Sequence, residues 1–480
     1  MTIKHSLTLI TFLLLAPLAA PTFGAEPKTS PVQSLDGDGW RIATDPKNEG
    51  REAKWFAAPR EEAKPTKVPA TIQQSFPGYH GAAWYWTEFA SPAATPGHRW
   101  QLCFGAVDYF AEVWLNGTRL GDHEGSDAPF EFDVSDALLA SGKNLLAVRV
   151  INPGHQPVDG FVIREIPHSF KQADHYAFGG NANSGGILLP VELRRQPVVR
   201  VTDVFAQADP ASGQVRLQVA IDNSTSAPAP CEIAAAVDRR DSDRDVRECS
   251  GEQRLTVQPG ATLCELAMTV HRPRLWSPQD PNLYAAEVVL GAEPAGVGPV
   301  MHRAAVRFGF RDFRVGADWF FRLNGRRLFL KSCHTVNNFP VAIGMPHKPE
   351  LMTRDLLYAK AMGFDMVWFL GGPPFPEQLR FCDEVGLMIY AEPRAAWQLH
   401  DSPKMAERFD RSLTQMILRD RNHPCITIWG LLNETGDGPV SRHAAESLRL
   451  QRLQEPERMP CLQQPLARRR SRWSARATSI

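Results

Sequence analysis

The hydrophobic period of this chain changes at about Trp319, and this change constrains the fold more than any other feature. Before it, short runs of alternating apolar and polar residues follow one another between turn signals, without a long amphipathic helix. After it, apolar runs of strand length alternate with runs of helical spacing. We therefore expect all-β domains first and then a domain in which strands and helices alternate around a parallel sheet.

The all-β part divides in two. Residues 26–197 predict one β-sandwich, in which Asn116-Gly117 forms a two-residue hairpin turn. Its expected strands include Gln101–Phe104, Phe110–Leu115 and Leu145–Ile151. Residues 198–312 predict a second sandwich, of the immunoglobulin-like kind, because short strands recur there at regular spacing. These strands include Val215–Ile221, Leu255–Val257 and Ala285–Leu290.

The part in which strands and helices alternate covers residues 313–448. It contains four expected strands, as in a parallel α/β sheet or barrel. The expected elements are strand Arg327–Lys331, helix Glu350–Met362, strand Met366–Leu370, helix Pro376–Val385, strand Leu387–Ala391, helix Met405–Arg421 and strand Ile426–Leu432.

The two ends of the chain have a different composition. Residues 1–25 have the layout of a secretory signal peptide, with Lys4 ahead of the apolar run Leu7–Ala20 and small residues up to Ala25. A signal peptide predicts a secreted or periplasmic protein with no membrane span after cleavage, since the run is short for a span. The alternatives are a buried N-terminal helix or an uncleaved anchor.

The last segment, residues 449–480, contains several arginines, including Arg468, Arg469 and Arg470, and no apolar period. Because the pattern breaks inside the expected fourth helix of the barrel, we interpret this segment as a disordered tail or a frame-shifted end. A functional basic arm would instead bind a polyanion.

The composition limits the partners. Lysine plus arginine (53) equals aspartate plus glutamate (53), so no strong field would concentrate a nucleic acid or an anionic membrane. A neutral carbohydrate fits better, and the 12 tryptophans are compatible with stacking on sugar rings. We expect no metal or other cofactor, because no spacing resembles a zinc site. Most of the eight cysteines should be buried thiols, and only Cys231, Cys249 and Cys264 suggest a disulfide.

The segment with the most specific chemistry runs from Arg419 to Glu434. The expected strand Ile426–Leu432 ends in Asn433-Glu434, and a carboxyl group at the carboxyl end of a barrel strand faces the catalytic mouth. Cleavage of a glycoside needs one protonated carboxyl group to donate to the leaving oxygen and a second to attack or to activate water. Glu434 suits the first role. The alternative is an ordinary carboxylate at the start of a helix.

The run Arg419–Glu434 resembles the acid/base signature of glycoside hydrolase family 2, which includes β-galactosidases, β-glucuronidases and β-mannosidases. From about Trp40 to about Leu448 the chain is similar to this family in order and position. The resemblance implies a jelly-roll β-sandwich that binds sugar, an immunoglobulin-like β-sandwich and then an incomplete (β/α)8 TIM barrel. The matching segments are Gly105–Tyr109, Val113–Gly117, Pro129–Val134, Gly185–Val191, Leu275–Pro278, Pro281–Tyr284, Phe308–Arg311 and Phe321–Lys331.

The resemblance also implies roles for individual residues. Glu434 matches the general acid/base, Asn433 the amide that orients the substrate, and Glu392 an acidic position at the mouth of the site. A buried structural ion pair is the alternative role for Glu392. Asp420 and His423 precede the fourth expected strand, so we expect them on the stability face of the barrel, in packing.

The chain departs from the family pattern near the expected sugar subsite. After the first strand, His334 occupies the usual asparagine position and Val336 the usual histidine position. At the end of the second strand, Trp368 stands where an arginine is common. Trp368 and Trp397 are therefore candidate stacking platforms, with core packing as the alternative.

The resemblance places the nucleophile at the end of a seventh barrel strand, and only four strands are expected here. No residue of the chain matches that nucleophile, so the sequence predicts an impaired retaining glycosidase for β-linked sugars. It also predicts two unpaired strand edges. The alternative function is a carbohydrate-binding module without catalysis, and a homo-oligomer is compatible with the sequence.

Overall fold

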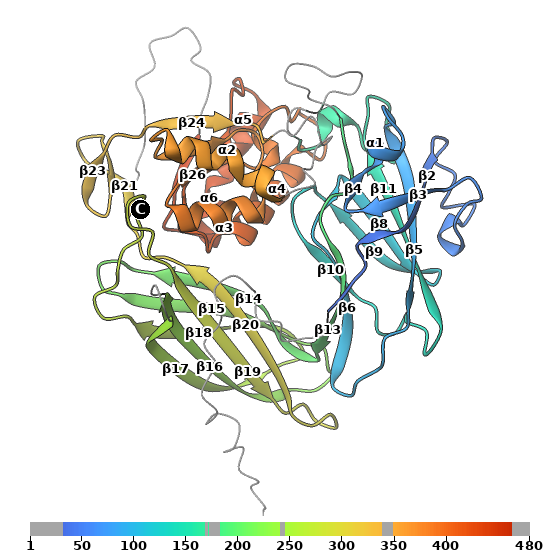
Figure 1. The fold of residues 1–480 in the computed structure, drawn as a ribbon, viewed down its shortest axis with the longest axis horizontal. Coiled ribbons are helices and arrows are strands. Elements are labelled where there is room, and N and C mark those ends of the chain that lie inside the picture. The colour runs from blue at the N-terminus through green and yellow to red at the C-terminus, as the bar shows by residue number, and fades with distance from the viewer. Residues whose placement is uncertain (1–31, 169–170, 172–182, 241–244, 338–348, 463–480) are drawn as a thin grey trace, which may run out of the picture.

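A computed structural model describes residues 32–168, 171, 183–240, 245–337 and 349–462. It contains two β-sandwiches and one α/β unit, which packs against both sandwiches (Figure 1). The expected fold class is confirmed. The expected signal peptide, residues 1–25, lies outside the described residues, as do residues 463–480. Within the described ranges, no helix combines the length and hydropathy that a membrane span requires.

The first sandwich packs a six-stranded sheet, in the order β3-β2-β5-β11-β8-β9, on a four-stranded sheet, β1-β13-β6-β10. Trp40, Tyr85 and Leu102 lie in the core between them. Asn116 and Gly117 both have positive φ, 53° and 80°, so the expected hairpin turn is confirmed. The strands are β1 (Val32–Ser34), β2 (Gly37–Asp45), β3 (Lys64–Val68), β4 (Ala70–Thr71), β5 (Gly81–Ala90), β6 (His98–Phe104), β7 (Val107–Asp108), β8 (Phe110–Leu115), β9 (Thr118–Glu124), β10 (Phe130–Asp133), β11 (Lys143–Asn152), β12 (Gly186–Ile187) and β13 (Val191–Pro197).

Three short helices lie among these strands. They are η1 (Trp55–Ala57), α1 (Ile72–Ser75) and η2 (Ile163–Glu165). The strands β4, β12 and β7 form a small third sheet beside the sandwich, in the order β4-β12-β7.

The second sandwich has sheets β14-β15-β18 and β17-β16-β19-β20. Its strands are β14 (Val199–Ala208), β15 (Gln214–Asn223), β16 (Ala229–Arg240), β17 (Asp245–Val257), β18 (Gly260–Thr269), β19 (Tyr284–Ala292) and β20 (Val300–Phe308). The suggested disulfide is wrong, because Cys231, Cys249 and Cys264 are all free thiols. In the β16–β17 ladder, Cys231 lies opposite Leu255 and Cys249 lies opposite Val237. Cys264 lies on β18, in the other sheet.

The entry into the α/β unit differs from the prediction. Arg327–Lys331 is not the first parallel strand. Residues 326–328 instead form β23 (Arg326–Leu328). This strand pairs antiparallel with β22 (Phe321–Leu323), which also pairs antiparallel with β21 (Phe313–Val315). The Asn324-Gly325 turn explains the difference, since both residues have positive φ and close a hairpin. The first parallel strand is β24 (Ser332–Thr335).

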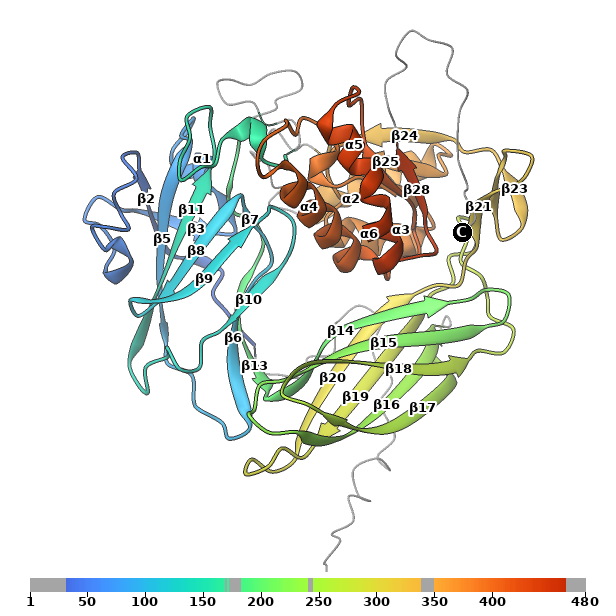
Figure 2. The ribbon, with the colours of Figure 1, turned by 180° about the vertical axis from the view of Figure 1, so that it is seen from behind.

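The α/β unit is a five-stranded parallel sheet, in the order β24-β25-β26-β27-β28. Its helices cover the sheet in Figures 1 and 2. The elements after β24 are α2 (Pro349–Ala361), β25 (Met366–Phe369), α3 (Pro376–Val385), β26 (Met388–Ala391), η5 (Arg394–Ala396), α4 (Met405–Asp420), β27 (Ile426–Leu432), α5 (Pro439–Glu446), α6 (Leu448–Gln454) and β28 (Met459–Leu462).

The prediction of four strands is therefore wrong, because β28 is a fifth. The prediction of an off-pattern tail over residues 449–480 is wrong for residues 449–462, which contain β28 and all of α6 but its first residue. Buried polar side chains hold α6 and the loop that leads to β28, which is why the sequence shows no apolar period there. The strand β28 itself is short and apolar, and Met459, Cys461 and Leu462 pack on the core. Trp429 Nε1 donates to Glu455 Oε2 (3.0 Å), Gln451 Nε2 to the Glu455 carbonyl (2.6 Å), and the Arg458 guanidinium to the His423 carbonyl (2.9 Å). Gln451, Glu455 and Arg458 are all buried.

Candidate active site

The carboxyl ends of the parallel strands bring most of the expected site residues together. His334 on β24, Trp368 on β25 and Tyr390 on β26 are register partners, so their side chains form one row across the sheet. The His334 and Trp368 ring centroids are 6.5 Å apart, and those of Trp368 and Tyr390 are 5.0 Å apart. Glu392 follows β26 directly. Sequence reasoning missed Tyr390, which only the register reveals.

Glu392 is a fully buried carboxyl group held by neutral donors. Its Oε1 accepts from Trp368 Nε1 (2.9 Å) and its Oε2 from the Gly371 backbone N–H (2.7 Å). Burial raises the pKa of Glu392 from 4.5 to about 7, against these two hydrogen bonds, which lower it. The carboxyl group therefore changes charge near neutral pH. Two hydrogen bonds from neutral groups, and not the ion pair considered above, hold it among the described residues.

Gly430 on β27 makes room for this arrangement. A Cβ atom at this position would lie 2.2 Å from Tyr390 Cε1 and 2.7 Å from Glu392 Cγ. Any side chain there would have to displace the ring or the carboxyl group. This glycine, in the middle of a buried strand, thus marks the place where the side chains of Tyr390 and Glu392 lie against the backbone of β27.

Trp368 is partly committed to packing, and its role as a stacking platform stays a prediction. Its ring is only half-buried, but one side contacts Tyr390 and its indole N–H is committed to Glu392. A sugar could therefore contact only the part of the ring that remains exposed. Trp397 is also half-buried and lies immediately after η5, at the edge of the same strand ends.

Asn433 and Glu434 form the turn after β27. The Asn433 backbone N–H donates to the Ala396 carbonyl (2.8 Å), and Asn433 is 2% exposed. Its side-chain Nδ2 is buried without a hydrogen-bond partner among the described residues. A buried donor without a partner costs about 1–3 kcal/mol, so this amide is suited to a substrate hydroxyl.

Glu434 itself is exposed and has a left-handed backbone, with φ of 46°. A non-glycine residue in this region costs about 1–2 kcal/mol and is a recurrent feature of functional turns. Glu434 is not the carboxylate of a helix start, because the N-cap of α5 is Gly438. The alternative role considered for it is therefore wrong.

Asp420 and His423 lie at the opposite end of β27, in packing contacts. His423 Nδ1 is 2.6 Å from Asp383 Oδ2, and Asp420 forms a two-point ion pair with Arg419 (2.6 and 2.7 Å). The neighbouring Asn422 accepts from the Ala206 N–H (2.9 Å) on the second sandwich. These side chains organise the contact between domains.

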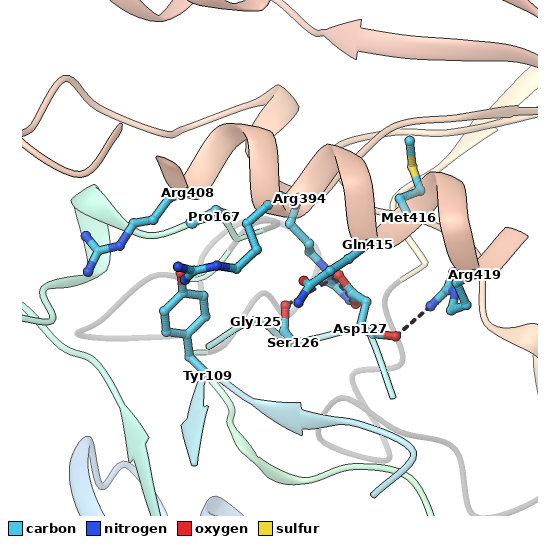
Figure 3. Close-up of a pocket in the computed structure, with 12 residues that line it drawn as sticks. Tyr109, Gly125, Ser126, Asp127, Pro167, Arg394, Arg408, Gln415, Met416 and Arg419 are labelled. Atoms are coloured by element: carbon cyan, nitrogen blue, oxygen red, sulfur yellow. Dashed lines mark hydrogen bonds and ion pairs between the residues drawn. The ribbon is translucent and has the colours of Figure 1, made fainter. Parts of the chain in front are cut away.

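The described residues contain no group of three or more His, Cys, Asp or Glu side chains that could hold a metal ion. Two cavities among the described residues lie at the seam between the first sandwich and α4. One is a small cavity of about 20 Å³ lined by residues such as Tyr109, Asp127 and Arg394 (Figure 3). The other is an open cleft of about 720 Å³ lined by charges of both signs. Sequence reasoning missed this seam, because no local pattern marks it.

Two β-sandwiches ahead of a parallel β/α unit with carboxyl groups at its strand ends define the architecture of a glycoside hydrolase. The chain belongs to glycoside hydrolase family 2. The model of this family for the sugar binding domain matches residues 69–181, a second model described only by the family name matches residues 199–311, and the model for the TIM barrel domain matches residues 317–452.

The names of the similar proteins give different glycosidase activities. A β-galactosidase of Thermoanaerobacter pseudethanolicus is 27% identical over 378 residues, which are 75% of this chain and 46% of that protein. A β-glucuronidase of Paenibacillus borealis is 24% identical over 474 residues, which are 92% of this chain and 75% of that protein. The chain thus spans about half the length of the first of these relatives.

Solved structures share the fold. A β-glucuronidase of Bacteroides uniformis has a TM-score of 0.71 and 20% identity, with 90% of this chain and 52% of that chain covered. A putative β-galactosidase of Bacteroides fragilis has a TM-score of 0.73 and 20% identity, with 90% and 63% covered.

Proposed function

We propose that this chain supplies the acid/base half of a retaining glycosidase site for β-linked sugars. Glu434 is the general acid/base, and Asn433 orients a sugar hydroxyl beside it. The observation that carries this proposal is the turn after β27, where an exposed carboxyl group in a left-handed conformation follows a buried amide donor without a partner. An exposed carboxyl group can reach the leaving oxygen of a bound sugar, and the amide gains the hydrogen bond that it lacks.

His334, Trp368 and Glu392 lie towards the carboxyl ends of β24, β25 and β26, in the same sheet as β27, and form part of the sugar subsite in our proposal. Glu392 changes charge near neutral pH, so it can accept from or donate to a sugar hydroxyl. The relatives include both β-galactosidases and β-glucuronidases by name. The identity of the sugar therefore depends on residues in which this chain departs from the common pattern, above all Trp368.

A retaining mechanism requires a second carboxyl group about 5–5.5 Å from the first. Among the described strand ends the carboxyl groups are Glu392, which Trp368 and Gly371 already bind, and Glu434 with Asp437 in one turn after β27. The nucleophile in our proposal therefore comes from further barrel strands. The 480-residue chain by itself should turn over aryl β-glycosides at no useful rate.

The test uses a form of the protein in which further β/α units close the barrel, and compares Glu434→Gln with Asp437→Asn. Asp437 is an exposed carboxylate in the same turn, so its variant is a matched control. The acid typically contributes about 100-fold to 10,000-fold, and Glu434→Gln should lose about this factor with poor leaving groups. Activated aryl leaving groups need no proton, so their first step should survive.

Azide completes this test because it attacks the glycosyl intermediate without a general base. It should rescue Glu434→Gln with activated substrates and yield a β-glycosyl azide, while Asp437→Asn behaves like the parent. If Glu434→Gln loses activity equally with every substrate and azide restores nothing, Glu434 is not the acid/base. Sugar binding without turnover in the closed form would favour the carbohydrate-binding alternative.

A further inference from the structure

An ion pair crosses the seam between the first sandwich and the α/β unit, close to the candidate site. Arg394, the first residue of η5, donates from Nε to both carboxylate oxygens of Asp127 (2.9 and 3.1 Å), and its terminal nitrogen lies 2.8 Å from Oδ1. The two side chains are only 18% and 17% exposed. A shielded two-point contact of this kind fixes direction as well as distance.

Both partners of this pair are held from elsewhere. Asp127 lies in the loop between β9 and β10, and its carbonyl accepts from the Arg419 guanidinium (2.9 Å) of α4. Figure 3 shows this bond, with Arg394 and Asp127 at the same seam. Next to Arg394, the Ala395 N–H donates to Ser412 Oγ (3.3 Å), also of α4. The pair therefore joins η5 to a rigid frame.

The η5 turn also holds the main chain on both sides of Glu434. The Ala396 carbonyl accepts from the Asn433 N–H (2.8 Å) and from Thr435 Oγ1 (3.2 Å), so a single oxygen is bound from both sides of Glu434. Glu434 has an unfavourable left-handed backbone between these two anchors. Its conformation thus depends on where η5 places that carbonyl.

We propose that Asp127 and Arg394 are positioning residues for Glu434, acting through η5 and the Ala396 carbonyl. The sandwich that the family model describes as sugar binding then has a second task, which is to fix the geometry of the acid. The proposal rests on the proposed function of Glu434. Neither Asp127 nor Arg394 touches the reacting atoms in this scheme.

The experiment is hydrogen–deuterium exchange of the 480-residue chain, followed by mass spectrometry. Asp127→Asn keeps the shape of the side chain and removes the charge. It should speed exchange about tenfold in peptides that contain 394–397 and 433–435, since a lost hydrogen bond to a charged group typically has at least this effect. Arg394→Lys keeps the charge but loses the two-point contact, and it should act in the same direction.

Two further variants separate positioning from general stability. Asp203→Asn removes another ion pair between a sandwich and the α/β unit, Asp203 with Arg421, at the opposite end of β27. It should leave exchange at 433–435 unchanged. Asp127→Glu retains a carboxylate for Arg394, and should return exchange to within about threefold of the parent, since the charged hydrogen bond is kept.

Unchanged exchange at 433–435 in both Asp127→Asn and Arg394→Lys would overturn the proposal. An equal effect of Asp203→Asn would do the same, because the role would then be general stability. These outcomes do not depend on whether Glu434 is an acid. If the exchange results are as expected but azide fails to rescue Glu434→Gln, the proposed function falls and the positioning contact stands.

Discussion

The buried carboxyl group of Glu392 should make the stability of the α/β unit depend on pH, and Glu392→Gln should remove this dependence. Glutamine has the shape of the protonated acid and carries no charge. Burial raises the pKa of Glu392 from 4.5 to about 7 in the folded chain. The folded chain therefore keeps a proton that the unfolded chain releases, and stability is lost as pH rises through this window.

The size of the effect follows from the pKa. A change from 4.5 to about 7 corresponds to about 3 kcal/mol, at about 1.4 kcal/mol for each tenfold change in proton affinity. Between pH 4.5 and pH 8, the wild-type protein should lose about 3 kcal/mol more of its unfolding free energy than Glu392→Gln does. Glutamine can accept at only one of its two end atoms, so either Trp368 Nε1 or the Gly371 N–H loses its acceptor, at a cost of about 1–3 kcal/mol. The variant should therefore be less stable than wild type by about this amount at pH 4.5, and should equal or exceed wild type at pH 8.

Urea unfolding at a series of pH values measures this difference, taken from the transition that includes the α/β unit. Glu384→Gln is a suitable control, because Glu384 is an exposed carboxylate on the neighbouring helix α3. Parallel pH profiles for wild type and Glu392→Gln would refute the reasoning. They would mean that water or a rearranged neighbour solvates the carboxylate in the folded chain.

Three other predictions follow from the fold and the site. The 480-residue chain should hydrolyse no aryl β-glycoside at a useful rate, and turnover that disappears in Glu434→Gln would show that another carboxyl group completes the pair. Residues 26–197 expressed alone should give a β-type far-ultraviolet circular dichroism spectrum and a cooperative melt, and a helical spectrum would contradict this. Arg311→Met should destabilise the chain by about 3 kcal/mol in urea unfolding, since it leaves the buried Pro424 and Ile426 carbonyls without their donor. A loss below about 1 kcal/mol would contradict this account of Arg311.

Much of the fold could be predicted because the period of the apolar residues is a local property. The bounds expected for Pro376–Val385 and Ile426–Leu432 agree with those of α3 and β27. The prediction was wrong where burial is polar, as in α6 and the loop that leads to β28. No period marks a helix whose inner face carries Gln451 and is followed by buried Glu455.

The candidate site could be predicted in part for the same reason. A residue at the end of a strand is visible in the sequence, so Glu392, Asn433 and Glu434 were all found. The contact between Asp127 and Arg394 joins residues 267 positions apart, and nothing in either local segment announces it. The neutral hydrogen bonds of Glu392 were also out of reach, because they depend on how β25 and β26 align.

The close approach at Gly430 limits how this site can change over generations. A larger residue at 430 is tolerable only if the side chains at 390 and 392 make room, because its Cβ would lie 2.2 Å from Tyr390 Cε1 and 2.7 Å from Glu392 Cγ. Mutation at any of these positions alone passes through a form with a clash or a void. The three positions should therefore change together, and a lineage that gains a side chain at 430 should carry a smaller residue at 390 or 392.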